Sequence, residues 1–169
     1  MTAHRVLFTG SRTYTDRDMV KAVIAGLGLN VMDDSFGDRH RPLQVAHGAA
    51  RGLDALVDDV VVNDFTSPVV TQRRCPADWA HCDPDHPEVP CPDDGGRHRQ
   101  RYAKTSGTYC PIAGLRRNAT MLVAFKPDLV VAFVDKQLHL SKGTNDMVER
   151  ARRAVIPYHV IQTMPGRTS

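Results

Sequence analysis

An apolar strand that leads through a loop into a helix, in residues 128–153, constrains the fold of this chain more than any other stretch. Residues 129–134 read Leu-Val-Val-Ala-Phe-Val, and such a continuous apolar run is typical of a parallel strand covered on both faces. Beyond a loop, Gly143-Thr144 opens a segment in which Met147, Val148 and Ala151 recur at helical spacing. A buried strand followed by an amphipathic helix is the repeating unit of α/β proteins.

The same alternation recurs along most of the chain. Strands are expected at residues 5–9, 43–46, 69–72 and 158–162 as well. Further helices are expected from residue 15 to the glycines at 26 and 28, from 53 to 63, and from 112 to 125. We therefore expect an α/β fold, a Rossmann-like parallel sheet of about five strands with helices on both faces. A chain of 169 residues is long enough to form one such domain, spanning residues 1–169.

Residues 75–111 break this pattern and form a Cys/Pro-rich insert within the domain. The insert holds all 4 cysteines, and their concentration in one aperiodic segment indicates a common role. Three thiolates and an imidazole make a zinc site. The expected ligands are Cys82, Cys91, His98 and Cys110. Cys75 and His86 are reserve ligands, and free thiols are the alternative because no C-x₂-C pair is present.

Loops that follow the strands carry the candidate ligand-binding residues. In parallel sheets ligands lie beyond the carboxyl ends of the strands, where residues 10–12, 47–54 and 141–146 would meet. A helix that starts at Gly143-Thr144 offers free N–H groups to an anion, although an ordinary helix N-terminus is the alternative. The candidates are Gly10, Ser11, Arg12, Gly48, Asp54, Arg117, Asn118, Gly143, Thr144 and Asn145.

Five motifs together carry a family resemblance. They are Thr9-Gly10-Ser11-Arg12, His47-Gly48-Ala49-Ala50-Arg51-Gly52-Leu53-Asp54, Pro76-Ala77-Asp78-Trp79, Ala113-Gly114-Leu115-Arg116-Arg117-Asn118 and Gly143-Thr144-Asn145-Asp146-Met147. The chain resembles the YspA-type branch of the SLOG superfamily, many of whose members occur in actinobacteria and their phages. The resemblance implies a Rossmann-like fold that binds a nucleotide or a nucleotide-derived ligand, as a sensor or as an enzyme. Apart from the zinc ion expected from the cysteines of the insert, no cofactor is implied.

The enzyme interpretation comes from the lonely-guy phosphoribohydrolases, which cleave the base from a nucleoside 5′-monophosphate. Their catalytic arginine matches Arg117, and their phosphate loop matches at Gly143-Thr144. Met147 occupies the position of their glutamate, and Asp146 is the nearest candidate carboxylate. The resemblance thus implies an N-glycosidic hydrolase that uses Arg117 and Asp146, or a protein that binds the nucleotide without cleaving it.

A different relative suggests another partner. The segment from Gly48 to Asp54 also resembles the Gly-x-Ala-x-Gly-Ile-Asp motif of the DprA family, which implies single-stranded DNA binding as the alternative function. Relatives often form dimers, so a homo-oligomer is an open expectation. No apolar run reaches the roughly 18 residues of a membrane span, and no signal peptide is evident. We therefore expect a cytoplasmic protein with no membrane partner.

Overall fold

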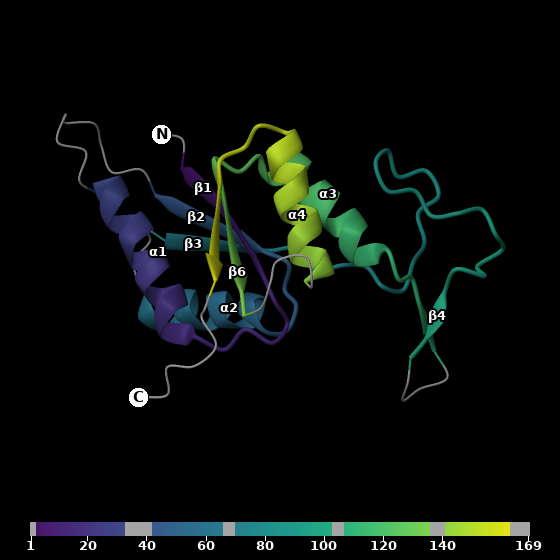
Figure 1. Ribbon diagram of the computed structural model, residues 1–169, viewed down its shortest axis with the longest axis horizontal. Helices are drawn as coiled ribbons and strands as arrows, with labels where there is room; N and C mark the ends of the chain where they lie inside the picture. The colour runs from purple at the N-terminus through teal and green to yellow at the C-terminus, as the bar shows by residue number, and fades with distance from the viewer. Residues whose placement is uncertain (1–2, 33–41, 66–69, 103–106, 136–140, 163–169) are drawn as a thin grey trace.

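The computed structural model describes residues 3–32, 42–65, 70–102, 107–135 and 141–162 (Figure 1). Its main sheet has five parallel strands in the order β3-β2-β1-β6-β7, which confirms the expected α/β fold. The strands are β1 (His4–Gly10), β2 (Leu43–His47), β3 (Val70–Arg74), β6 (Leu129–Val134) and β7 (Tyr158–Gln162). The helices are α1 (Arg17–Met32), α2 (Leu53–Asp64), α3 (Ala113–Phe125) and α4 (Lys142–Arg153).

The side chains of the central strands alternate between two apolar layers. In β1, Val6 and Phe8 pack with residues of α1 and α2, whereas Leu7 packs with residues of α3 and α4. Both layers are buried, which explains why the centre of β1 (Val6-Leu7-Phe8) and the whole of β6 are continuously apolar instead of alternating with polar residues. Helices α1 and α2 therefore cover one face of the sheet, and α3 and α4 cover the other (Figure 1).

Helix α1 differs at both ends from the helix expected from the sequence. It starts at Arg17, because the Asp16 carboxylate accepts a hydrogen bond from the backbone N–H of Met19 at 2.9 Å and caps the first turn. It continues through Gly26 and Gly28 to Met32, so the prediction that these glycines end the helix was wrong. Packing of the helix against the sheet outweighs the roughly 1 kcal/mol that each glycine costs. The polar connection expected at residues 33–42 lies mostly outside the described residues.

The insert has a small structure of its own. Two short antiparallel strands, β4 (Gln100–Arg101) and β5 (Thr108–Tyr109), form a hairpin that the sequence pattern did not indicate. Beside it, the buried Cys91, Cys110 and Ala113 form a separate apolar cluster. In Figure 1 the insert extends away from the sheet on the side of α3.

The strand order places the carboxyl ends of β1, β2 and β6 next to one another. Strand β1 pairs with β2 on one side and with β6 on the other, so the chain order reverses at β1. Such a reversal opens a crevice between the loops that leave the strands in opposite directions. Among the described residues, no helix has both the length and the apolar character that crossing a membrane requires.

A candidate ligand cavity and a candidate metal centre

A cavity of about 660 Å³ lies at the carboxyl ends of β1 and β2, beside the start of α4. It is large enough for a mononucleotide, because ligand pockets commonly measure about 300–1,000 Å³. Eight of the expected binding residues line it: Gly10, Ser11, Arg12, Gly48, Asp54, Arg117, Gly143 and Thr144. The structure therefore brings the three loops together at one cavity.

The loop after β1 is fastened to its neighbours at Ser11. The Ser11 N–H donates to the Phe133 carbonyl of β6 at 3.0 Å, and its carbonyl accepts the Leu53 N–H of α2 at 3.2 Å. The Ser11 hydroxyl, which is buried, donates a hydrogen bond to the Asp135 carboxylate. These bonds hold the backbone beside Arg12 in place, and the exposed Arg12 side chain lines the cavity.

The loop after β2 depends on Gly52 and Asp54. Gly52 has a φ of 78°, and a Cβ there would lie 2.5 Å from the Ser11 carbonyl oxygen, so glycine is required. Asp54 accepts the Ala50 N–H at 3.1 Å and is only 7% exposed. Burial raises the pKa of Asp54, although the Ala50 N–H and Arg117 oppose that rise. Asp54 thus places a partly desolvated carboxyl at the cavity wall.

Arg117 lies between this loop and helix α3. One of its terminal nitrogens, Nη1, donates to the Gly48 carbonyl at 2.5 Å and to the Cys75 carbonyl at 3.4 Å. The same nitrogen lies 4.0 Å from the Asp54 carboxylate. Burial lowers the pKa of Arg117 and Asp54 opposes the decrease, yet an arginine stays charged. Arg117 is half-buried and its neighbour Arg116 is buried, so neither arginine of the pair lies on a fully solvated helix face.

The start of α4 forms another wall of the cavity. Ser141 precedes the helix without capping it, because its hydroxyl bonds the Thr144 hydroxyl at 2.8 Å instead of a backbone N–H. The first N–H groups of the helix lack a side-chain cap from Ser141 and can donate to an anion. Lys142, Gly143 and Thr144 all line the cavity there.

Three expected site residues lie beside the cavity without lining it: Asn118, Asn145 and Asp146. Asn118 is buried, and its amide donates to the Gly143 carbonyl and to the Asp146 carboxylate, each at 3.0 Å. Asp146 also accepts from Arg150 Nε at 3.0 Å. Asn118 therefore positions the start of α4, and the Asp146 carboxylate is held in hydrogen bonds within the protein.

Among the lining residues that were not expected from the sequence to bind ligand, Lys142 and Trp79 have side chains suited to recognising one. Lys142 is the first residue of α4. A cation directly before Gly143 is the feature of the sequence that could have indicated a role in ligand binding. Trp79, within the Pro76-Ala77-Asp78-Trp79 motif, lies under the Arg12 guanidinium at 5.8 Å. A lone tryptophan is found both in cores and in binding sites, so its type and position do not separate the two roles.

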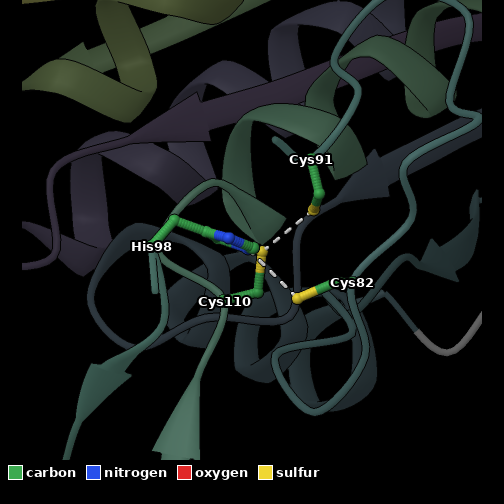
Figure 2. Close-up of side chains that lie close together, drawn as sticks. All are labelled: Cys82, Cys91, His98 and Cys110. Atoms are coloured by element: carbon green, nitrogen blue, oxygen red, sulfur yellow. Dashed lines mark hydrogen bonds between the residues drawn. The ribbon is translucent and has the colours of Figure 1, made fainter. Parts of the chain in front are cut away.

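The expected metal ligands gather at one point in the insert. The ligand atoms of Cys82, Cys91, His98 and Cys110 all lie within 4.8 Å of one another, and the four side chains converge in Figure 2. Cys82 Sγ is 3.2 Å from His98 Nε2, and Cys91 Sγ is 3.5 Å from Cys110 Sγ. Sulfur ligands at about 2.3 Å from a tetrahedral zinc ion would be about 3.8 Å apart. The cluster could therefore hold a metal ion, and its cysteines form no disulfide.

Side chains around this cluster orient the candidate ligands, and two arginines offset the negative charge of the thiolates. His98 Nδ1 lies 2.8 Å from the Asp94 carboxylate, so its Nε2 faces the sulfur atoms, as in a carboxylate–histidine–metal arrangement. Arg116 donates to Cys91 Sγ at 3.0 Å, and Arg99 donates to Cys82 Sγ at 3.2 Å. Asp94 was not part of the expected ligand set. Its position four residues before His98 is the feature of the sequence that could have indicated this role.

The electrostatics of the cluster favour charged forms of two ligands. Burial by itself would raise the pKa of Cys91, but the Asp83 N–H, the Cys110 thiol and Arg116 together lower it to about 7. The hydrogen bond with Asp94 raises the pKa of His98 to about 9, against burial. Burial raises the pKa of Cys110. Metal binding requires the Cys91 thiolate that this lowered pKa favours, and it also requires His98 to lose its Nε2 proton.

The reserve ligands lie elsewhere. Cys75, at the end of β3, packs against the layer under α3 and α4, and His86 Nε2 lies 3.2 Å from the Thr120 hydroxyl.

No protein-family model, curated protein or solved structure matches this chain.

Proposed function

We propose that this protein binds a nucleotide or a nucleotide-derived ligand in the cavity at the carboxyl ends of its strands. The observation that carries the proposal is the convergence of Arg12, Arg117 and Lys142 with the start of α4 on one cavity of about 660 Å³. Three cations and free helix N–H groups suit a phosphate group. The apolar residues Pro76, Trp79 and Leu115 line the same cavity and suit a base.

The arrangement favours binding over hydrolysis by the residues that the lonely-guy resemblance implies. Asp146 is hydrogen-bonded to Asn118 and Arg150, and it does not line the cavity. Asp54 is the carboxyl that does line it, 4.0 Å from Arg117. An N-glycosidic hydrolase built on this site would therefore use Asp54 at the ribose. The simpler interpretation is a sensor that holds its nucleotide intact.

Titration calorimetry with adenosine 5′-monophosphate tests the binding proposal. Arg12→Ala should weaken binding about tenfold, because a hydrogen bond to a charged group contributes roughly 1.5 kcal/mol or more. Arg153→Ala is the matched control, since Arg153 is also an exposed arginine and does not line the cavity. Equal affinity in the Arg12 and Arg153 variants, or no binding of any nucleoside monophosphate, would contradict the proposal.

Two further measurements separate the alternatives. Incubation with nucleoside monophosphates, followed by chromatography for free base, detects hydrolysis, and Asp54→Asn should abolish any base release while Asp146→Asn should not. Single-stranded DNA binding would appear as an affinity for an oligonucleotide that falls steeply with salt. Mononucleotide binding without such an affinity would exclude the DNA alternative.

We further propose that Cys82, Cys91, His98 and Cys110 bind a structural zinc ion. Three thiolates and one imidazole fill a tetrahedral site completely, which is the pattern of structural zinc. Three thiolates around one zinc ion carry a net charge of about −1, and Arg99 and Arg116 donate to two of the sulfur atoms. The Asp94–His98 hydrogen bond supplies the outer partner that metal-bound histidines usually have.

Elemental analysis of the purified protein tests this site. We expect about one zinc ion per chain, as for other four-ligand structural sites. Cys82→Ser should remove most of it. Cys75→Ser is the matched control, because Cys75 is the one cysteine outside the cluster. Full zinc content in the Cys82 variant, or equal loss in both variants, would contradict the assignment.

A further inference from the structure

Trp79 belongs both to the ligand cavity and to the apolar cluster around the metal centre. Its ring lines the cavity below Arg12. It also packs against the cluster formed by Cys91, Cys110 and Ala113. The ring contacts helix α3 so closely that a Cβ added at Gly114 would lie 3.3 Å from it. One side chain therefore connects the two sites.

The backbone around Trp79 is held by the metal ligands and their neighbours. The Trp79 carbonyl accepts the N–H of Cys110 at 2.9 Å, and Cys82 follows three residues later along the chain. Arg116 donates to the His81 carbonyl at 2.7 Å with one nitrogen and to Cys91 Sγ at 3.0 Å with another. Residues 76–79 belong to neither a helix nor a strand, so no ladder of backbone hydrogen bonds fixes them.

We propose that the metal centre holds Trp79 in place as the surface on which the base of the ligand stacks. Metal occupancy then sets the affinity for the base and leaves the affinity for the sugar phosphate almost unchanged. The inference rests on the proposed nucleotide binding. The cations and the start of α4 recognise the phosphate, and they belong to the sheet domain. The ring of Trp79 belongs to the insert, whose order depends on the metal.

The chemistry of the cavity agrees with this division. Aromatic side chains stack on any base, because every base has a π face. The Arg12 guanidinium lies 5.8 Å from the ring centroid, so a phosphate-binding cation and the aromatic surface adjoin within one cavity. The ring is half-buried, so part of it remains open to the cavity while the rest packs. Loss of one base–aromatic stack should weaken binding by about 10- to 100-fold.

Calorimetry on the full chain tests the inference with two probes, adenosine 5′-monophosphate and ribose 5-phosphate, which lacks the base. Trp79→Leu should weaken the nucleotide about 10- to 100-fold and change the affinity for ribose 5-phosphate less than twofold. Chelation of the metal from the native protein should reproduce both results. In the Trp79 variant, chelation should have no further effect on either probe.

Controls keep the result independent of misfolding. Retained ribose 5-phosphate binding shows that the sheet and its loops are folded in each variant. Cys82→Ser should act like chelation, whereas Cys75→Ser should act like the native protein. Trp79 is the only tryptophan of the chain, so its fluorescence reports directly on the ring. Emission should shift to longer wavelength on metal removal and should be quenched by the nucleotide in the metal-loaded protein.

The outcomes distinguish this inference from the proposal that the cavity binds a nucleotide. If both probes bind but chelation leaves the nucleotide affinity unchanged, the coupling is wrong and the nucleotide cavity stands. If Trp79→Leu weakens both probes equally, the ring only supports the fold. If neither probe binds the native protein, the proposed function fails and this inference fails with it.

Discussion

The buried Asp54 and the half-buried Arg117 form a pair of charges whose atoms are not in tight contact. Their nearest nitrogen and oxygen are 4.0 Å apart, while Arg117 Nη1 is used by the Gly48 carbonyl at 2.5 Å. The Asp54 carboxylate accepts a hydrogen bond from the Ala50 N–H, but the Arg117 guanidinium is too far away to donate one. A buried charge without a close partner destabilises a fold. This cost is typical of a binding site, where a ligand later supplies the missing contacts.

The pH dependence of stability should reveal that cost. Burial raises the pKa of Asp54, so the folded protein binds the Asp54 proton more tightly than the unfolded chain does. The resulting stabilisation is complete below the unfolded pKa of about 3.9 and is lost as the pH rises through the folded pKa. Relative to Asp54→Asn, the native protein should therefore lose stability from about pH 4 upward. Urea unfolding of both proteins across pH 4 to 8 measures this difference, and a constant difference would contradict it.

At the scale of elements, the sequence predicts the strands and helices well where burial alone determines the pattern. The apolar run of β6 and the helical stripe of α4 were located within one or two residues because both lie in the core. The hairpin of β4 and β5 could not be predicted, since its strands are two residues long and largely exposed. The end of α1 was misplaced because the contacts that extend it are tertiary.

Two glycines offer a direct test of how these elements form. Gly26 lies inside α1, and a Cβ there would meet nothing within 4 Å, so Gly26→Ala should stabilise the protein by about 0.5–1 kcal/mol. Gly52 has a φ of 78° and no room for a Cβ, so Gly52→Ala should destabilise it by at least about 1 kcal/mol. Urea denaturation measures both changes. A destabilising Gly26→Ala would show that α1 does not continue through this position.

For the whole molecule, the candidate sites were predictable in part. Strand order brings Gly10, Gly48 and Gly143 together, and any parallel sheet with this pattern would do so. The clustering of the four candidate metal ligands depends on the path of the insert, and their spacing along the chain contains no regular motif. The place of Trp79 between the two sites is a tertiary property as well, and no local pattern could indicate it.

The insert and the sheet should differ in what stabilises them. The sheet has two extensive apolar layers, whereas the apolar cluster of the insert is small and adjoins a hairpin of two-residue strands. A structural zinc ion can contribute on the order of 10 kcal/mol to the folding of a small unit. Metal removal should therefore unfold the insert while the sheet remains folded.

Limited proteolysis with trypsin measures this difference, because Arg97, Arg99 and Arg101 all lie in the insert near the metal ligands. After chelation, cleavage at these arginines should become at least about tenfold faster, since cleavage follows the population of the open segment. Arg99 should show the largest change, because in the folded insert it donates to Cys82 Sγ and to the Thr108 carbonyl. Cys75→Ser should resist trypsin as the native protein does. Cleavage that begins in α1, at Arg17 or Lys21, after chelation would mean that the metal stabilises the whole molecule, and that the sheet does not fold independently of its insert.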